Sequence, residues 1–307
     1  MAATPLALNV SRVVQKGRMK KLFYRIGITL GLIIVVVYVL VHVNLLMNEN
    51  AKIFVGANLS VKERLTTSIE VSIPWDTFRV TTEDGVGILL LESPLANAPE
   101  APWVIYFYGQ AGQLGDEGSL ARYNLFHNAG LNVLAVEYRG YGASEKRETT
   151  EAGVYADARA AWRHLTEIRG VPASRVVLYG FSLGGGVAIQ LATEILPAGL
   201  ITEGAFTSAP AMARIKYPWL ATVMMRNRFE NLEKARKLSL PWLIFHGRRD
   251  SRVSFMHAEA LAGTVAGARH LVPLESGHGD GPKVEGDHME RVLTEFVGEL
   301  FGPDHDT

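Results

Sequence analysis

A single serine lies between glycines near the middle of the chain, in the run Gly180-Phe181-Ser182-Leu183-Gly184. An apolar stretch precedes this run and a segment of helical spacing follows it, which predicts a turn from a strand into a helix. In such a turn, side chains two positions before and after the serine would collide, and glycine removes the collision. The helix start also directs its amide groups toward the serine hydroxyl. The pattern therefore predicts Ser182 as a nucleophile, with Gly180 and Gly184 as the glycines that permit its turn.

Glycines before a helix can also form a phosphate-binding turn or an ordinary corner. A P-loop requires Lys followed by Ser or Thr after its last glycine, whereas Val187 and Ala188 occupy those positions. The glycine spacing of a dinucleotide-binding turn is also absent from this run. The strand-turn-helix setting favours the nucleophile over these alternatives.

A serine hydroxyl is a poor nucleophile at neutral pH, so a base and a group that orients the base are needed. Asp250 ends the apolar run WLIFHGRRD, and His278 lies in the loop SGHGD after another apolar run. The order Ser, Asp, His and the positions after predicted strands suit this chemistry. His246 lies inside a strand and is predicted to be a core or edge residue. The remaining candidates fall on or beside helical segments and are predicted to lie on the surface: His257, His270 and His288.

An acyl-transfer reaction also needs donors for the oxyanion of its tetrahedral intermediate. The backbone N–H of Leu183, directly after the nucleophile, is one predicted donor. The other is the N–H of Gln110, in the small-residue loop that follows the apolar run PWVIYFYG. Asp280 or Asp287 with His278 and His288 would be the candidate metal ligands, but their spacing is not typical of a metal site. The sequence predicts neither a metal nor a cofactor.

Apolar, strand-like runs alternate with helical segments from Trp75 to about residue 302. The strand-like runs cover residues 102–109, 131–140, 174–182, 199–208, 240–250 and 268–278, after a hairpin that turns at 83–85. The helical segments cover 116–129, 151–169, 184–196, 255–267 and 288–301. This alternation predicts one α/β domain at 75–302, with a doubly wound, mostly parallel sheet and helices on both faces. Residues 209–239 lengthen one connection and are predicted to form a small cap.

Residues 26–46 form an apolar run of 21 residues that would span about 30 Å as a helix, which predicts a transmembrane anchor. Six Lys and Arg residues lie in the basic segment 1–25, and three lie in the thirty residues after the run. This asymmetry predicts a cytoplasmic N-terminus and a catalytic domain outside the cytoplasm, in a periplasm or lumen. Residues 47–74 show no regular period and are predicted to be a linker or lead-in.

The composition excludes some classes of function. Basic and acidic residues both number 31, so the formal net charge is zero and binding to nucleic acid is not expected. The absence of cysteine excludes disulfides, a thiol nucleophile and thiolate metal sites.

Four pieces of the sequence, GFSLGG, EYRGYGAS, RFENLEKARKLSLPWLIFHGRRDSRV and SGHGD, together resemble the Bem46 and ABHD13-like branch of the serine α/β-hydrolases. The similarity covers roughly residues 75–300. It implies an α/β-hydrolase fold with Ser182 as nucleophile, His278 as base and Asp250 as orienting residue. Two departures stand out: the family usually has His-Gly-Asn-Ala where Tyr108 begins the run Tyr-Gly-Gln-Ala, and Asn where Gly279 follows the histidine.

These observations lead us to expect a membrane-anchored serine hydrolase that cleaves carboxylic esters or thioesters of small or lipid-derived acyl substrates through an acyl-enzyme. One alternative is a serine peptidase or acyltransferase that uses the same triad. The other is a non-catalytic, membrane-tethered binding protein that keeps the fold.

Overall fold

The computed structural model describes residues 5–58, 74–264 and 269–302, which belong to two units, Met1–Asn48 and Glu49–Thr307. The described residues therefore do not include 1–4 of the basic segment, 59–73 of the expected linker, 265–267 of an expected helix, 268 of an expected strand-like run or the tail 303–307.

The described part of the first unit is one continuous helix, α1 (Pro5–Met47). Its stretch Arg18–Met47 is long and apolar enough, by length and composition, to cross a membrane. Apolar side chains are exposed along this stretch, for example Ile34 at 67% and Leu40 at 61%. A helix that exposes apolar residues on all sides is suited to a lipid environment.

The second unit is built on an eight-stranded sheet with the order β1-β2-β4-β3-β5-β6-β7-β8. The strands are β1 (Asp76–Thr81), β2 (Gly87–Ser93), β3 (Trp103–Phe107), β4 (Asn132–Glu137), β5 (Val176–Phe181), β6 (Gly199–Glu203), β7 (Trp242–Gly247) and β8 (Arg269–Leu274). Only β2 is antiparallel to its neighbours β1 and β4, and the other pairs are parallel. Every residue of β3, β4, β6 and β7 is buried, as expected for parallel strands covered on both faces.

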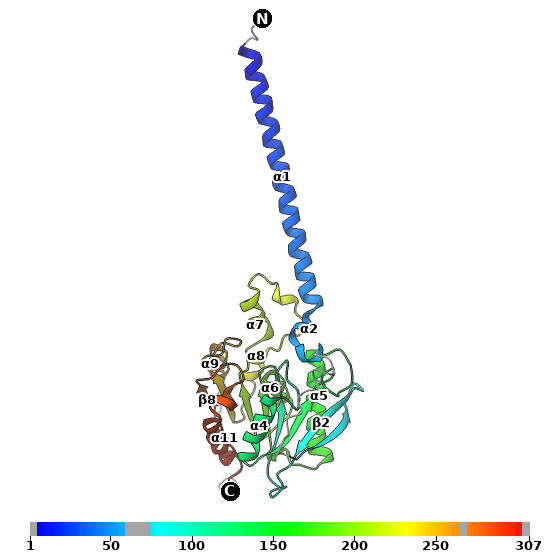
Figure 1. The fold of residues 1–307 in the computed structure, drawn as a ribbon, viewed down its shortest axis with the longest axis vertical. Helices are drawn as coiled ribbons and strands as arrows, with labels where there is room; N and C mark the ends of the chain where they lie inside the picture. The colour runs from blue at the N-terminus through cyan, green and yellow to red at the C-terminus, as the bar shows by residue number, and fades with distance from the viewer. Residues whose placement is uncertain (1–4, 59–73, 265–268, 303–307) are drawn as a thin grey trace. The chain divides into compact units, whose positions relative to one another are not determined.

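Helices pack around the sheet of this unit in two groups (Figure 1). One group includes α4 (Glu117–Asn128), α10 (Gly281–Val284) and α11 (Gly286–Phe301), which contact one another. The other includes α5 (Glu151–Arg163), α6 (Leu183–Glu194), α8 (Asn231–Ala235) and α9 (Met256–Ala262). The remaining helical elements are α2 (Glu49–Ile53), η1 (Val55–Asn58), η2 (His164–Ile168), η3 (Ala173–Arg175), α7 (Ala209–Lys216) and η4 (Thr222–Met224).

Two segments differ in detail from the pattern expected from sequence. The helix expected over 151–169 ends its α-helical geometry at Arg163 and continues as the π-turn η2, before Gly170 reverses the chain with φ +72°. Residues 49–58, within the expected linker, form α2 and η1, and Phe54 is buried in the core of the second unit. An aromatic side chain that is 1% exposed shows that this segment packs as part of the unit.

Candidate active site

Ser182 adopts a backbone conformation that few non-glycine residues occupy. It lies between β5 and α6 with φ +52° and ψ −112°. A Cβ at Gly180 would lie 2.6 Å from the Cα of Gly185, and a Cβ at Gly184 would lie 2.7 Å from the carbonyl oxygen of Tyr108. Both distances are shorter than real side-chain contacts, so glycine is required on each side of the strained serine.

The side chains of Ser182, His278 and Asp250 form one continuous hydrogen-bonded chain. His278 Nε2 lies 2.9 Å from Ser182 Oγ, and His278 Nδ1 lies 2.6 Å from Asp250 Oδ2. Asp250 follows β7 and His278 follows β8, so two neighbouring strand ends deliver the two residues to the serine. The structure thus brings together all three residues expected from their order in the sequence, in a geometry suited to nucleophile activation.

The carboxylate of Asp250 is held on both of its oxygens. Oδ2 is bonded to His278, and Oδ1 accepts the backbone N–H groups of Arg252 and Val253, each at 2.8 Å. Burial favours the neutral acid, but the hydrogen bonds from His278 and from these amides outweigh it and lower the pKa of Asp250 below its ordinary value. Asp250 is therefore a fixed anion that favours an Nδ1–H tautomer of His278.

The other histidines are less suited to the role of base. His246 is completely buried in β7, its Nε2 lies 2.8 Å from the carbonyl oxygen of Val253, and burial lowers its pKa. The expectation that His257 lies on the surface is wrong, because its side chain packs inward and Nδ1 lies 2.9 Å from Thr207 Oγ1. Burial also lowers the pKa of His257. His270 is 46% exposed, as expected for a surface residue.

A cavity of about 220 Å³ opens beside Ser182 and His278. The loop of Gln110 borders it, and a Cβ at Gly109 would lie only 3.3 Å from the Cβ of Ser182. The Leu183 N–H belongs to the first residue of α6, where no intrahelical acceptor exists. Both amides expected to bind an oxyanion thus lie in the backbone next to the serine.

Arg122, which lines this cavity, forms a buried ion pair that the sequence patterns did not predict. Arg122 of α4 binds Glu203, at the end of β6, through Nε–Oε2 at 2.7 Å and Nη2–Oε1 at 2.5 Å. The Arg122 guanidinium also stacks 4.1 Å from the centre of the Phe181 ring and donates to the carbonyl oxygen of Gly279 at 3.3 Å. The backbone carbonyl of Glu203 accepts the N–H of Ser182 at 2.8 Å. The pair therefore connects the serine turn with the histidine loop, and a glutamate ending an otherwise apolar strand was its only signal in the sequence.

Gly279, which directly follows His278, has φ +84°. A Cβ at this position would lie 3.0 Å from Cε2 of Phe181 and closer still to its Cζ. The Phe181 ring also packs against the His278 ring, with centroids 5.3 Å apart. Glycine thus lets the histidine loop approach the aromatic side chain beside the nucleophile.

The fold and this geometry agree with comparisons to known proteins. The model of the alpha/beta hydrolase family matches residues 106–282. The chain belongs to the alpha/beta hydrolase family.

The relatives in sequence support the Bem46 branch within this family. Protein bem46 of Schizosaccharomyces pombe is 30% identical over 252 residues, covering 78% of this chain and 81% of that protein. Human alpha/beta hydrolase domain-containing protein 17B is 32% identical over 206 residues, covering 66% of this chain and 68% of that protein. A Mycobacterium tuberculosis protein is 32% identical over 222 residues, covering 72% and 78%.

Solved structures share the fold at lower identity. An esterase of Pyrococcus furiosus superposes with a TM-score of 0.64 at 19% identity, covering 76% of this chain and 93% of the esterase. Est1E of Butyrivibrio proteoclasticus, solved with ferulic acid, gives a TM-score of 0.61 at 18% identity, covering 72% and 98%. These structural neighbours share the α/β-hydrolase fold with the second unit of this chain.

Proposed function

We propose that this protein is a membrane-anchored serine hydrolase that cleaves carboxylic esters or thioesters through an acyl-enzyme. The observation that carries the proposal is the hydrogen-bonded chain from Ser182 Oγ through His278 to Asp250. The strained serine turn and the esterases among the structural neighbours also support the proposal. No metal or cofactor takes part in this chemistry.

In the proposed reaction, Ser182 Oγ attacks the acyl carbon while His278 Nε2 takes the hydroxyl proton. Asp250 stabilises the imidazolium, and the N–H groups of Gln110 and Leu183 bind the oxyanion of the tetrahedral intermediate. His278 then gives the proton to the departing alcohol or thiol, which leaves the acyl group on Ser182. Water then attacks the acyl carbon while His278 accepts one of its protons. The second intermediate collapses as the bond between the acyl carbon and Ser182 Oγ breaks, His278 returns the proton to Oγ, and the acid leaves.

The size of the cavity bears on the substrate. Its volume of about 220 Å³ lies below the range of about 300–1,000 Å³ that holds drug-sized ligands. Among the described residues, none of those that line it comes from the segment 209–239, which was expected to form a cap. A compact acyl group fits inside this cavity, whereas a long acyl chain would extend beyond it.

The anchor and the orientation complete the proposal. Residues 26–46 lie within the apolar part of α1, and the basic residues that precede them favour a cytoplasmic N-terminus. The hydrolase unit would then act outside the cytoplasm. A reporter enzyme fused to the C-terminus, active only in the cytosol, should remain inactive, and a cytosolic signal would contradict this orientation.

The proposed chemistry is tested by turnover of a panel of esters and thioesters. Ser182→Ala should abolish turnover with the melting temperature preserved. Ser254→Ala, which alters an exposed serine outside the triad, should turn over the same substrates at the wild-type rate. Full turnover by Ser182→Ala would refute the proposal.

A further inference from the structure

The loop that carries Gln110 has both of its flanking peptide groups fixed by hydrogen bonds. Tyr138 donates its hydroxyl to the carbonyl oxygen of Tyr108 at 3.1 Å. Tyr141 donates its hydroxyl to the carbonyl oxygen of Gln110 at 2.8 Å. The backbone N–H of Gly56 donates to the same oxygen of Gln110, also at 2.8 Å. Two tyrosines of the run EYRGYGAS and a residue of η1 therefore hold this loop together.

These bonds determine where the Gln110 N–H points. In a trans peptide the C=O and N–H groups point in opposite directions, so a bound carbonyl also fixes the amide that follows it. The carbonyl of Gly109, in the same peptide group as the Gln110 N–H, accepts the N–H of Gly112 at 3.0 Å. The peptide group before this one is bound by Tyr138, and the peptide group after it is bound by Tyr141 and Gly56. The backbone around the Gln110 N–H therefore has little freedom to rotate.

The side chain of Tyr108 adds a further constraint on this loop. Its hydroxyl donates to the carboxylate of Glu137 at 2.5 Å and accepts the backbone N–H of Tyr138 at 3.3 Å. Burial raises the pKa of Tyr108, Tyr138 and Tyr141 above the ordinary value, so all three hydroxyls remain protonated donors. The three rings also pack against one another, with centroids 4.8 to 5.8 Å apart.

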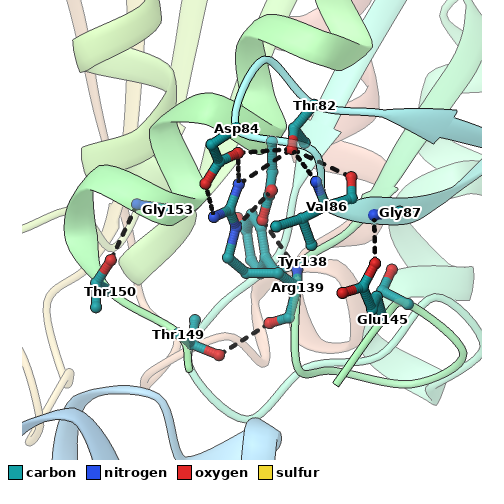
Figure 2. A network of polar contacts seen from close by, with 12 residues as sticks. Thr82, Asp84, Val86, Gly87, Tyr138, Arg139, Glu145, Thr149, Thr150 and Gly153 are labelled. Carbon is teal, nitrogen blue, oxygen red and sulfur yellow. Dashed lines mark hydrogen bonds and ion pairs between the residues drawn. The ribbon is translucent and has the colours of Figure 1, made fainter. Parts of the chain in front are cut away.

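Figure 2 shows the polar contacts of Arg139, which directly follows Tyr138 in the chain. Arg139 donates two hydrogen bonds to the carboxylate of Asp84 in the β1–β2 turn and two to Asp157 of α5. Thr149 donates its hydroxyl to the carbonyl oxygen of Arg139 at 2.8 Å. The run EYRGYGAS is therefore fixed to the turn between β1 and β2 and to α5.

Gly56 is also held in place. The carboxylate of Glu49, at the start of α2, accepts the backbone N–H groups of Arg226 and Asn227 at 3.1 and 2.6 Å. Phe54 packs in the core against Phe229, with ring centroids 6.2 Å apart. A Cβ at Gly56 would lie 2.7 Å from Cδ1 of Tyr141, so only glycine fits this position without displacing the ring.

We propose that Tyr138, Tyr141 and Gly56 are positioning residues that hold the Gln110 N–H toward the oxyanion of the reaction. This inference rests on the proposed function, since it assigns a purpose to residues around the same serine. It places part of the support of the oxyanion site in residues 49–58, outside the part of the chain matched by the family model.

The test compares Tyr138→Phe and Tyr141→Phe with the control Tyr155→Phe in the full-length, detergent-solubilised protein. Tyr155 is also a buried tyrosine with a bonded hydroxyl, which donates to Glu151 at 2.7 Å, away from the loop. Loss of a direct oxyanion donor lowers kcat by about 10²–10³-fold, so loss of one positioning bond should lower it by about tenfold. KM should stay within about twofold, because the bond serves the transition state rather than substrate binding.

A boronic acid that forms a tetrahedral adduct with the serine gives a second readout. Its affinity should fall in parallel with kcat/KM in Tyr138→Phe and Tyr141→Phe, and stay unchanged in Tyr155→Phe. Gly56→Ala should have a larger effect in the same direction, because its methyl group displaces Tyr141. Wild-type kcat and boronate affinity in both tyrosine variants would overturn the inference, whereas turnover by Ser182→Ala would overturn the proposed function itself.

Discussion

Arg122 and Glu203 form a two-point ion pair whose side chains are only 1% and 4% exposed. Removing one partner of a buried pair leaves an uncompensated charge, so Glu203→Gln should reduce the free energy of unfolding by roughly 3–5 kcal/mol. The double variant Arg122→Met/Glu203→Leu removes both charges, so its free energy of unfolding should fall by less than that of Glu203→Gln. Thermal or denaturant unfolding of the three proteins measures this, and a Glu203→Gln variant as stable as the wild type would contradict it.

The role of Asp250 predicts a loss of turnover with little change in the fold. Asp250→Asn keeps the shape of the side chain but cannot stabilise the imidazolium or favour the Nδ1–H tautomer, so kcat should fall by about 10³–10⁴-fold. Steady-state kinetics with circular dichroism as a check on folding measures this effect. Full activity in a folded Asp250→Asn protein would remove Asp250 from the proposed triad.

Asp250 also predicts how stability depends on pH. Its folded-state pKa is lowered below the ordinary value of 3.8, so its carboxylate contributes stability that is complete above that value. This contribution is lost as the pH falls through the folded-state pKa. The stability difference between the wild type and Asp250→Asn should therefore shrink as the pH falls below about 4. Melting temperatures of both proteins above and below this pH test it, and a difference that grows on acidification would be the opposite result.

Gly279 provides a steric prediction. Gly279→Asn adds a side chain whose Cβ would collide with the Phe181 ring and displace the loop of His278. We expect at least a tenfold fall in kcat/KM, of the order seen when catalytic groups are misplaced by about 1 Å. Adding Phe181→Ala to Gly279→Asn removes the collision and should recover part of the activity. Wild-type activity in Gly279→Asn alone would show that the contact is unimportant.

The cavity predicts a preference for short acyl groups. In a series of p-nitrophenyl esters, kcat/KM should be highest for short acyl chains and decline for chains too long for about 220 Å³. The measurement uses monomeric substrate below any micelle concentration, so that aggregation does not limit the rate. A steady rise in kcat/KM toward long chains would show that the substrate occupies another surface.

Much of the fold and of the candidate site could be predicted because local patterns determine them. The parallel strands appear as continuous apolar runs, and the serine turn has its glycines at fixed offsets from Ser182. Asp250 and His278 could be found because the carboxyl ends of parallel strands meet at one edge of the sheet.

The rest depends on contacts between residues far apart in the sequence. Arg122 and Glu203 are 81 positions apart, and nothing near either residue identifies its partner. The burial of His257 depends on packing beside Thr207 rather than on its helical periodicity. Gly56 lies in a segment without a regular period, so its bond to the loop of Gln110 is visible only in three dimensions.

Covalent labelling of the serine shows whether Ser182 is a nucleophile activated by His278. The full-length protein is treated with a fluorophosphonate, and the adduct is located by mass spectrometry of peptides. We expect one adduct per chain on Ser182, no adduct in Ser182→Ala and much slower labelling in His278→Ala. A wild-type protein that resists modification, or one labelled equally well in Ser182→Ala, would contradict this role of Ser182.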